Sequence, residues 1–122
     1  MKLRIRANTI RLRLSQSEIK SLETGNSVEA SLFFEPKFKY KIEVQTIDKI
    51  ACNYEDNSLV ISLPSQEVRA WVGSEQVGIR GIQILENGDE IKILVEKDFR
   101  CLVPRGEEED LDTFTHPKEH SK

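Results

Sequence analysis

Short runs of alternating apolar and charged residues cover most of the chain, and this period of two constrains the fold more than any other feature. Side chains on a β-strand point to opposite faces in turn, so such runs predict strands with one buried face. In the first run Leu3 and Ile5 alternate with basic residues, but the apolar positions become even-numbered at Ile10. A regular strand cannot change faces, so we predict a tight turn or a bulge at residues 7–9.

Further runs predict a series of short strands joined by turns. Residues 28–35 and 37–44 alternate in the same way around a turn at Pro36. Residues 50–54 and 59–63 are typical of a hairpin with a longer loop at residues 55–58. The dipeptide Asn87-Gly88 indicates a second hairpin, formed by strands near residues 77–84 and 91–95.

Two short helices interrupt the strands. Ser15 and Glu18 have the spacing of a capping box, and Gly25 is suited to follow the end of this first helix. The second helix opens after Pro64, and Trp71 on its apolar face is interpreted as a core anchor. Helices of two to three turns are stable only when packed on other elements.

These elements predict an α+β fold with a curved, mainly antiparallel sheet, open or partly closed, and two short helices packed on it. A chain of 122 residues fits one domain, which we place at residues 1–104. Residues 105–122 are acidic and polar, and we predict a flexible tail outside the core. No internal sequence repeat is visible.

The composition indicates a cytoplasmic protein. No apolar run is long enough to cross a bilayer, and the N-terminal run lacks the apolar block of a signal peptide. Cys52 and Cys101 are far apart and form no paired motif, so we expect free thiols. Nothing in the sequence calls for a cofactor.

Charge is unevenly distributed along the chain. Residues 1–50 hold ten Lys and Arg against six Asp and Glu, whereas residues 51–122 hold eight against fifteen, within a net charge of −3. The basic and acidic parts either pair with each other or face different partners, and the sequence does not choose between these alternatives.

The strongest candidate site is a set of basic residues on the predicted strands. Arginines on one sheet face can hold an anion through bidentate contacts. A solvated face whose arginines pair with carboxylates is the alternative, and the change of parity at residues 7–9 makes one shared face harder to achieve. The candidate anion-binding residues are Arg4, Arg6, Arg11, Arg13, Lys39 and Lys41.

Other site chemistry is weakly indicated. Phe38 and Tyr40 alternate with the lysines and are interpreted as core residues, which argues against a stacking surface for nucleic acid. The lysines of this strand are also explained as protection of an edge strand. His116 and His120 are separated by Pro117 and lack further ligands, so no metal site is predicted. No local catalytic motif is present, so we predict no catalytic residue and disfavour an enzyme.

The opening alternation of Arg and apolar residues over residues 1–14 resembles that of a family of short uncharacterised bacterial proteins. The likeness extends over most of the chain and includes the Trp71 helix and a second segment, Glu96-Lys97-Asp98-Phe99-Arg100-Cys101-Leu102. This chain has Ala7 where the family leads us to expect Gly, and His116-Pro117 where it leads us to expect Asn-Pro. The resemblance implies a bacterial cytoplasmic protein and carries no established activity.

Three hypotheses of function follow. The first is a non-enzymatic binding or interaction module that engages a protein partner, without membrane contact. The second is a binder of small or polymeric anions through the candidate arginines. The third is an enzyme of unknown class. The sequence does not identify the ligand, the partner or the oligomeric state.

Overall fold

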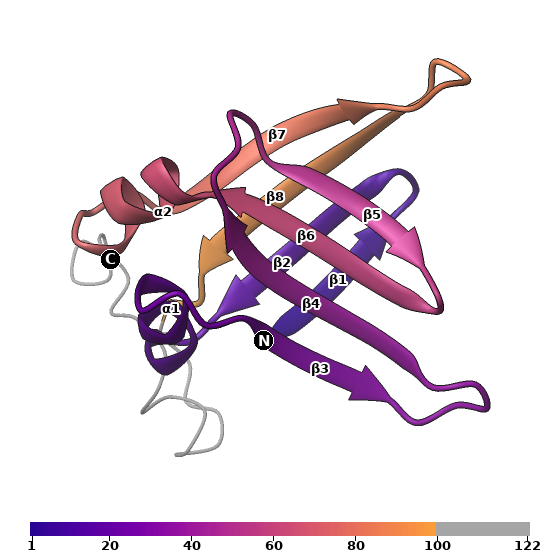
Figure 1. Ribbon diagram of the computed structural model, residues 1–122, viewed down its shortest axis with the longest axis horizontal. Coiled ribbons are helices and arrows are strands. Elements are labelled where there is room, and N and C mark those ends of the chain that lie inside the picture. The colour runs from indigo at the N-terminus through magenta and orange to yellow at the C-terminus, as the bar shows by residue number, and fades with distance from the viewer. Residues whose placement is uncertain (100–122) are drawn as a thin grey trace, which may run out of the picture.

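The computed structural model describes residues 1–99, which form eight strands and two helices (Figure 1). The strands are β1 (Lys2–Arg6), β2 (Thr9–Leu14), β3 (Val28–Leu32), β4 (Phe38–Gln45), β5 (Ala51–Glu55), β6 (Ser58–Pro64), β7 (Gly78–Ile84) and β8 (Glu90–Lys97). The helices are α1 (Gln16–Glu23) and α2 (Ser65–Val72). The α+β class is confirmed. The predictions for Cys101, His116, His120 and residues 105–122 lie outside the described residues.

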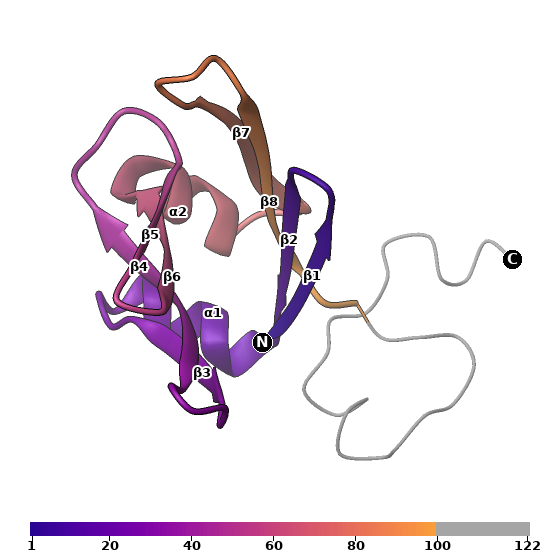
Figure 2. The ribbon, with the colours of Figure 1, turned by 90° about the vertical axis from the view of Figure 1, so that its right-hand side faces the viewer.

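The strands form two four-stranded sheets where the sequence predicts a single curved one. Sheet A has the order β1-β2-β8-β7 and sheet B the order β3-β4-β6-β5. Each sheet has antiparallel outer pairs and one central parallel pair, β2 with β8 and β4 with β6. Figure 2 shows the two sheets on opposite sides of the core, and neither is closed within residues 1–99.

The topology is an internal repeat that the sequence does not reveal. The first unit (β1, β2, α1, β3, β4) and the second unit (β5, β6, α2, β7, β8) have the same order of elements. Each sheet combines the first hairpin of one unit with the second hairpin of the other. The backbone N–H of Lys92 donates to the carbonyl of Asn8 at 2.9 Å, and that of Lys39 donates to Asn57 at 3.0 Å. These two bonds are equivalent, because each joins the turn of a first hairpin to the last strand of a second hairpin.

The change of parity near the N-terminus is a two-residue hairpin turn. Arg6 pairs with Thr9 across Ala7 and Asn8, and Ala7 has a φ of 50°. Of the two alternatives predicted for residues 7–9, a tight turn or a bulge, the structure has the tight turn. The loop between β5 and β6 is also a two-residue turn and is shorter than predicted. Its residues, Asp56 and Asn57, have φ values of 53° and 58°, a left-handed conformation that these two residue types tolerate well.

The second predicted strand is shorter than its sequence pattern. Its pairing with β4 ends where Leu32 meets Phe38, so β3 stops before Phe33. Phe33 and Phe34 are exposed in the loop that follows. The alternating pattern alone could not locate the end of β3, because the pattern continues beyond Leu32, the last residue of β3 that pairs with β4.

The helices and the core agree with the sequence analysis. The capping box at Ser15 and Glu18 is present, and Gly25 follows the C-cap of α1 with a φ of 91°. Trp71 is fully buried, and its indole N–H donates to the carbonyl of Val77 at 3.1 Å. The two helices pack against each other at one end of the sandwich, and the hairpin turns lie at the other end (Figure 1).

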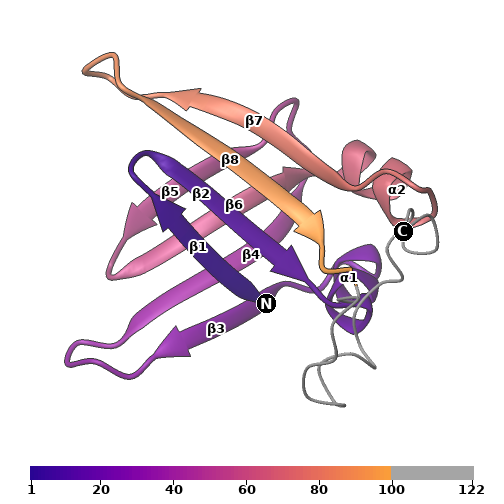
Figure 3. The ribbon, with the colours of Figure 1, turned by 180° about the vertical axis from the view of Figure 1, so that it is seen from behind.

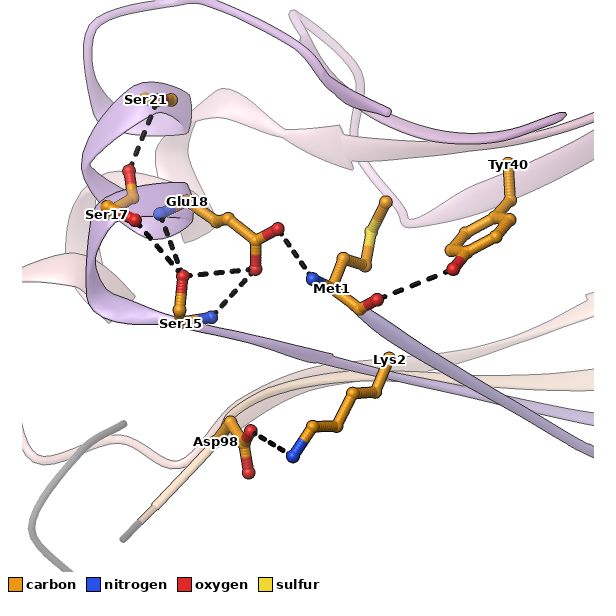
Figure 4. A network of polar contacts seen from close by, with 8 residues as sticks. All are labelled: Met1, Lys2, Ser15, Ser17, Glu18, Ser21, Tyr40 and Asp98. Atoms are coloured by element: carbon orange, nitrogen blue, oxygen red, sulfur yellow. Dashed lines mark hydrogen bonds and ion pairs between the residues drawn. The ribbon is translucent and has the colours of Figure 1, made fainter. Parts of the chain in front are cut away.

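Polar contacts fix the beginning of β1 (Figure 4). The amino group of Met1 forms an ion pair with Glu18 at 2.6 Å, and the hydroxyl of Tyr40 donates to the carbonyl of Met1 at 3.5 Å. Lys2 forms an ion pair with Asp98 at 3.0 Å. These contacts tie β1 to α1, to β4 and to the end of β8.

Candidate functional site: a basic sheet face

The four candidate arginines lie on one face of sheet A. In an antiparallel pair, residues directly opposite each other point to the same side, and Arg4 is opposite Arg11 while Lys2 is opposite Arg13. Arg6 follows Arg4 at a spacing of two and shares its side. The two-residue hairpin turn accounts for this arrangement. It places the even-numbered residues of β1 opposite the odd-numbered residues of β2, so the arginines of both strands point to the same side.

Two neighbouring strands add cations to this face. Leu94 of β8 is opposite both Arg11 and Arg80, so Arg80 and Lys92 also point outward. Figure 3 shows sheet A from this side. We define the basic face as Lys2, Arg4, Arg6, Arg11, Arg13, Arg80 and Lys92. Only Glu90 and Glu96 among the outward-pointing residues of these four strands are acidic.

Glu96 engages two of the four candidate arginines. One carboxylate oxygen of Glu96 accepts from Arg11 at 2.6 Å and from Arg13 at 3.0 Å, and this carboxylate is nearly buried. Within residues 1–99, Arg4 and Arg6 form no ion pair, although both are exposed. Within the described residues, the guanidinium groups on β1 are therefore not engaged by a carboxylate, and the same holds for the exposed Arg80 on β7.

The two candidate lysines do not belong to this surface. Lys39 and Lys41 point outward from sheet B, on the opposite side of the sandwich. Lys39 is 3.5 Å from Glu29 and Lys41 is 4.0 Å from Glu43, so each has a carboxylate neighbour. Their strand β4 is central in sheet B, so protection of an edge strand does not explain them.

An apolar pocket of about 330 Å³ lies between the two sheets at the hairpin end. Ile5 and Tyr54 contribute to its wall and are 59% and 63% exposed, so the pocket opens to solvent. The rings of Phe38 and Tyr54 lie near each other in a tilted arrangement, with centroids 6.5 Å apart. Both units contribute equivalent positions to the wall, which is lined by Ile5, Ala7, Asn8, Ile10, Phe38, Tyr54, Leu59 and Ile91.

The described part of the chain offers little for metal or thiol chemistry. No cluster of three or more His, Cys, Asp or Glu able to hold a metal occurs within residues 1–99. Burial raises the pKa of the Cys52 thiol, which disfavours the reactive thiolate. Burial also lowers the pKa of Lys97, whose ammonium donates to the carbonyl of Ser74 at 2.6 Å.

Sequence reasoning missed several residues of this region. Arg80 and Lys92 join the basic face only through the pairing of β8 with both β2 and β7, which links distant parts of the chain. Glu96 lies in an alternating run, but no local signal indicates that two arginines converge on it. Ile5 and Tyr54 follow the apolar pattern of core residues, and only the separation of the sheets at the hairpin end exposes them.

By fold and surface, the chain is a two-sheet α+β protein with an internally repeated topology and one basic sheet face. It belongs to a family of unknown function, DUF7009, whose model matches residues 1–118. No curated protein and no solved structure matches the chain. Neither helix of the described residues has the length and apolar content needed to cross a membrane.

Proposed function

We propose that this protein is a non-enzymatic binding module that holds an acidic segment of a partner protein on the basic face of sheet A. The observation that carries the proposal is the β1–β2 register, which gathers Arg4, Arg6, Arg11 and Arg13 on one side. Guanidinium groups bind carboxylates in bidentate geometry, and several on one face can engage successive acidic side chains.

The chemistry of the face favours an acidic protein over single-stranded nucleic acid. Bases stack on aromatic side chains, and none of the outward-pointing residues of β1, β2, β7 and β8 is aromatic. Ile82 and Ile84 are exposed on the same side of β7 and can contact apolar residues of a protein. The bacterial cytoplasm is the proposed location, and the free thiol of Cys52 supports a reducing compartment.

The test measures binding of a fluorescein-labelled peptide rich in Glu and Asp by fluorescence anisotropy. We expect the double variant Arg4→Glu/Arg6→Glu to lose about tenfold or more in affinity, since two attractive charges become repulsive. The matched control, Lys39→Glu/Lys41→Glu, makes the same charge change on the outer face of sheet B and should leave the affinity nearly unchanged. Added salt should weaken binding by the parent protein.

Two outcomes would overturn the proposal. Equal losses in the two double variants would show that net charge, and not the basic face, controls binding. Tighter binding of polyphosphate or of an oligonucleotide than of the peptide would instead identify a binder of polymeric anions, which is the second candidate function for the same face. Thermal melts of both variants establish that they fold.

A further inference from the structure

The outer edge of β1 has no strand beside it in the described structure. Sheet A begins with β1, and β2 is its only hydrogen-bonded neighbour within residues 1–99. The side chains of Arg4, Ile5 and Arg6 are exposed. An unpaired edge of this kind is a template for another extended segment.

The turn geometry identifies which backbone groups point to this edge. A two-residue hairpin turn closes on a hydrogen-bonded pair, here Arg6 and Thr9, and such pairs then alternate with pairs that are not bonded to each other. Arg4 and Arg11 are therefore a bonded pair. The N–H and C=O groups of Leu3 and Ile5 point away from β2, toward the open edge.

The second unit shows how the equivalent edge is satisfied inside the molecule. Cys52 on β5 occupies the position equivalent to Leu3, counted back from its own hairpin turn. The Gln83 side chain accepts from the N–H of Cys52 at 2.7 Å and donates to its C=O at 2.9 Å. This carboxamide makes the two bonds that an added strand would make. Leu3 has no such partner within the described residues.

The side chains of β1 indicate what an added segment must carry. Arg4 and Arg6 point outward, so residues beside them on an added strand should be acidic. Ile5 points inward and lines the apolar pocket, so the residue beside it should be apolar. A second copy of this chain pairing through β1 would bring arginines together, and this repulsion disfavours self-association. The free edge of β3 carries Glu29 on its outer face and does not favour an acidic partner.

We propose that β1 binds an extended partner segment of alternating acidic and apolar residues as an additional strand of sheet A, with an apolar side chain in the pocket beside Ile5. This inference rests on the proposed function and names the form of the partner segment. The contacts of Met1 and Lys2 hold β1 in place before binding, which reduces the ordering that binding requires.

The experiment uses the full chain and two short labelled peptides, one alternating Glu with Val and the other alternating Glu with Ser. We expect the Glu–Val peptide to bind the parent protein about tenfold more tightly, because only its apolar side chains can enter the pocket. The variant Ile5→Ser should remove most of this difference, because it takes away part of the apolar wall that the Val side chains would contact. Ile5 is exposed, so the substitution should leave the fold intact.

Amide hydrogen exchange, followed by NMR, distinguishes strand pairing from charge attraction, because charge attraction alone does not slow the exchange of particular backbone amides. Saturation with the Glu–Val peptide should slow exchange of the Leu3 and Ile5 amides, whereas the Arg4 amide, already bonded to β2, should change little. Peptide binding that depends on Arg4 and Arg6 without protection of these two amides would overturn the added strand and leave the proposed function standing. Absence of binding, or binding insensitive to reversal of both arginines, would overturn both.

Discussion

The strands β1 and β5 occupy equivalent positions in the two units, yet the backbone groups on their outer edges have different partners. The edge of β5 is covered through Gln83 of β7, which bonds the backbone of Cys52. The edge of β1 has no corresponding contact within residues 1–99. The outward side chains differ as well, since β1 carries Lys2, Arg4 and Arg6 whereas β5 carries Ala51, Asn53 and Glu55.

In a protein built from two similar units, features shared by both units are separated from features present in only one. Both units use the same order of hairpins and helices and the same parallel pairing to build the core, so these shared features explain stability. The covered edge of β5 completes the fold internally. The open edge and the outward arginines of β1 have no counterpart on β5, the equivalent strand of the second unit, within residues 1–99. We therefore associate them with the proposed binding.

The largest expected effect on stability concerns the close packing of β7 against the start of β5. A Cβ atom added at Gly81 of β7 would lie 2.2 Å from Cγ2 of Ile50, beside the start of β5. We expect Gly81→Ala to lower the free energy of unfolding by about 1–3 kcal/mol, because overpacking forces the two strands apart. Urea denaturation measures this change.

The matched control for this substitution is Gly73→Ala, since a Cβ atom at Gly73 meets nothing within 4 Å. Its free energy of unfolding should stay within about 0.5 kcal/mol of the parent value, as is usual for surface substitutions. Equal losses at Gly73 and Gly81 would contradict the view that close packing of β7 covers the β5 edge.

A smaller effect is expected from Gln83→Met, which keeps the approximate volume and removes both hydrogen bonds to Cys52. The stranded N–H and C=O groups should lower the free energy of unfolding by about 1–2 kcal/mol. Exchange of the Cys52 amide should become faster. Gln45→Met is the control, because Gln45 is exposed and its side chain bonds only Glu43 within the described residues.

This second substitution also sharpens the comparison of the two edges. It leaves β5 with an open edge like that of β1, but without outward arginines. An acidic peptide should therefore bind the Gln83→Met variant no more tightly than the parent protein. A new acidic-peptide site on β5 would show that an open edge alone is sufficient and that the arginines are not required.

Local sequence patterns predicted the elements well, because their causes are local. The capping box of Ser15 and Glu18, the burial of Trp71 and the turn at residues 7–9 each depend on residues close in sequence. The arrangement of strands was not predictable in this way. The parallel pairs join residues such as Leu12 and Val95, and an alternating pattern does not identify its distant partner.

The candidate site was predicted in part for the same reason. Alternation marked the arginines, but the turn at Ala7 decided that they share a face, and a bulge would have allowed a different result. Lys39 and Lys41 match the arginines in composition and lie on the other sheet. The repeat escaped detection because equivalent positions preserve only general character, as with Ile5 and Tyr54, so the two units share a pattern and not a sequence.

The smallest predicted effect concerns the turns that begin the two units. Ala7 has a φ of 50°, a left-handed conformation in which a Cβ atom is strained and glycine is not. We expect Ala7→Gly to raise the free energy of unfolding by about 0.5–1 kcal/mol, measured by urea denaturation. Asp56→Gly at the equivalent position should give a smaller gain, since Asp tolerates this conformation better than Ala. A larger gain in the free energy of unfolding at Asp56 would contradict this order. It would mean that the β5–β6 turn is more strained than the β1–β2 turn.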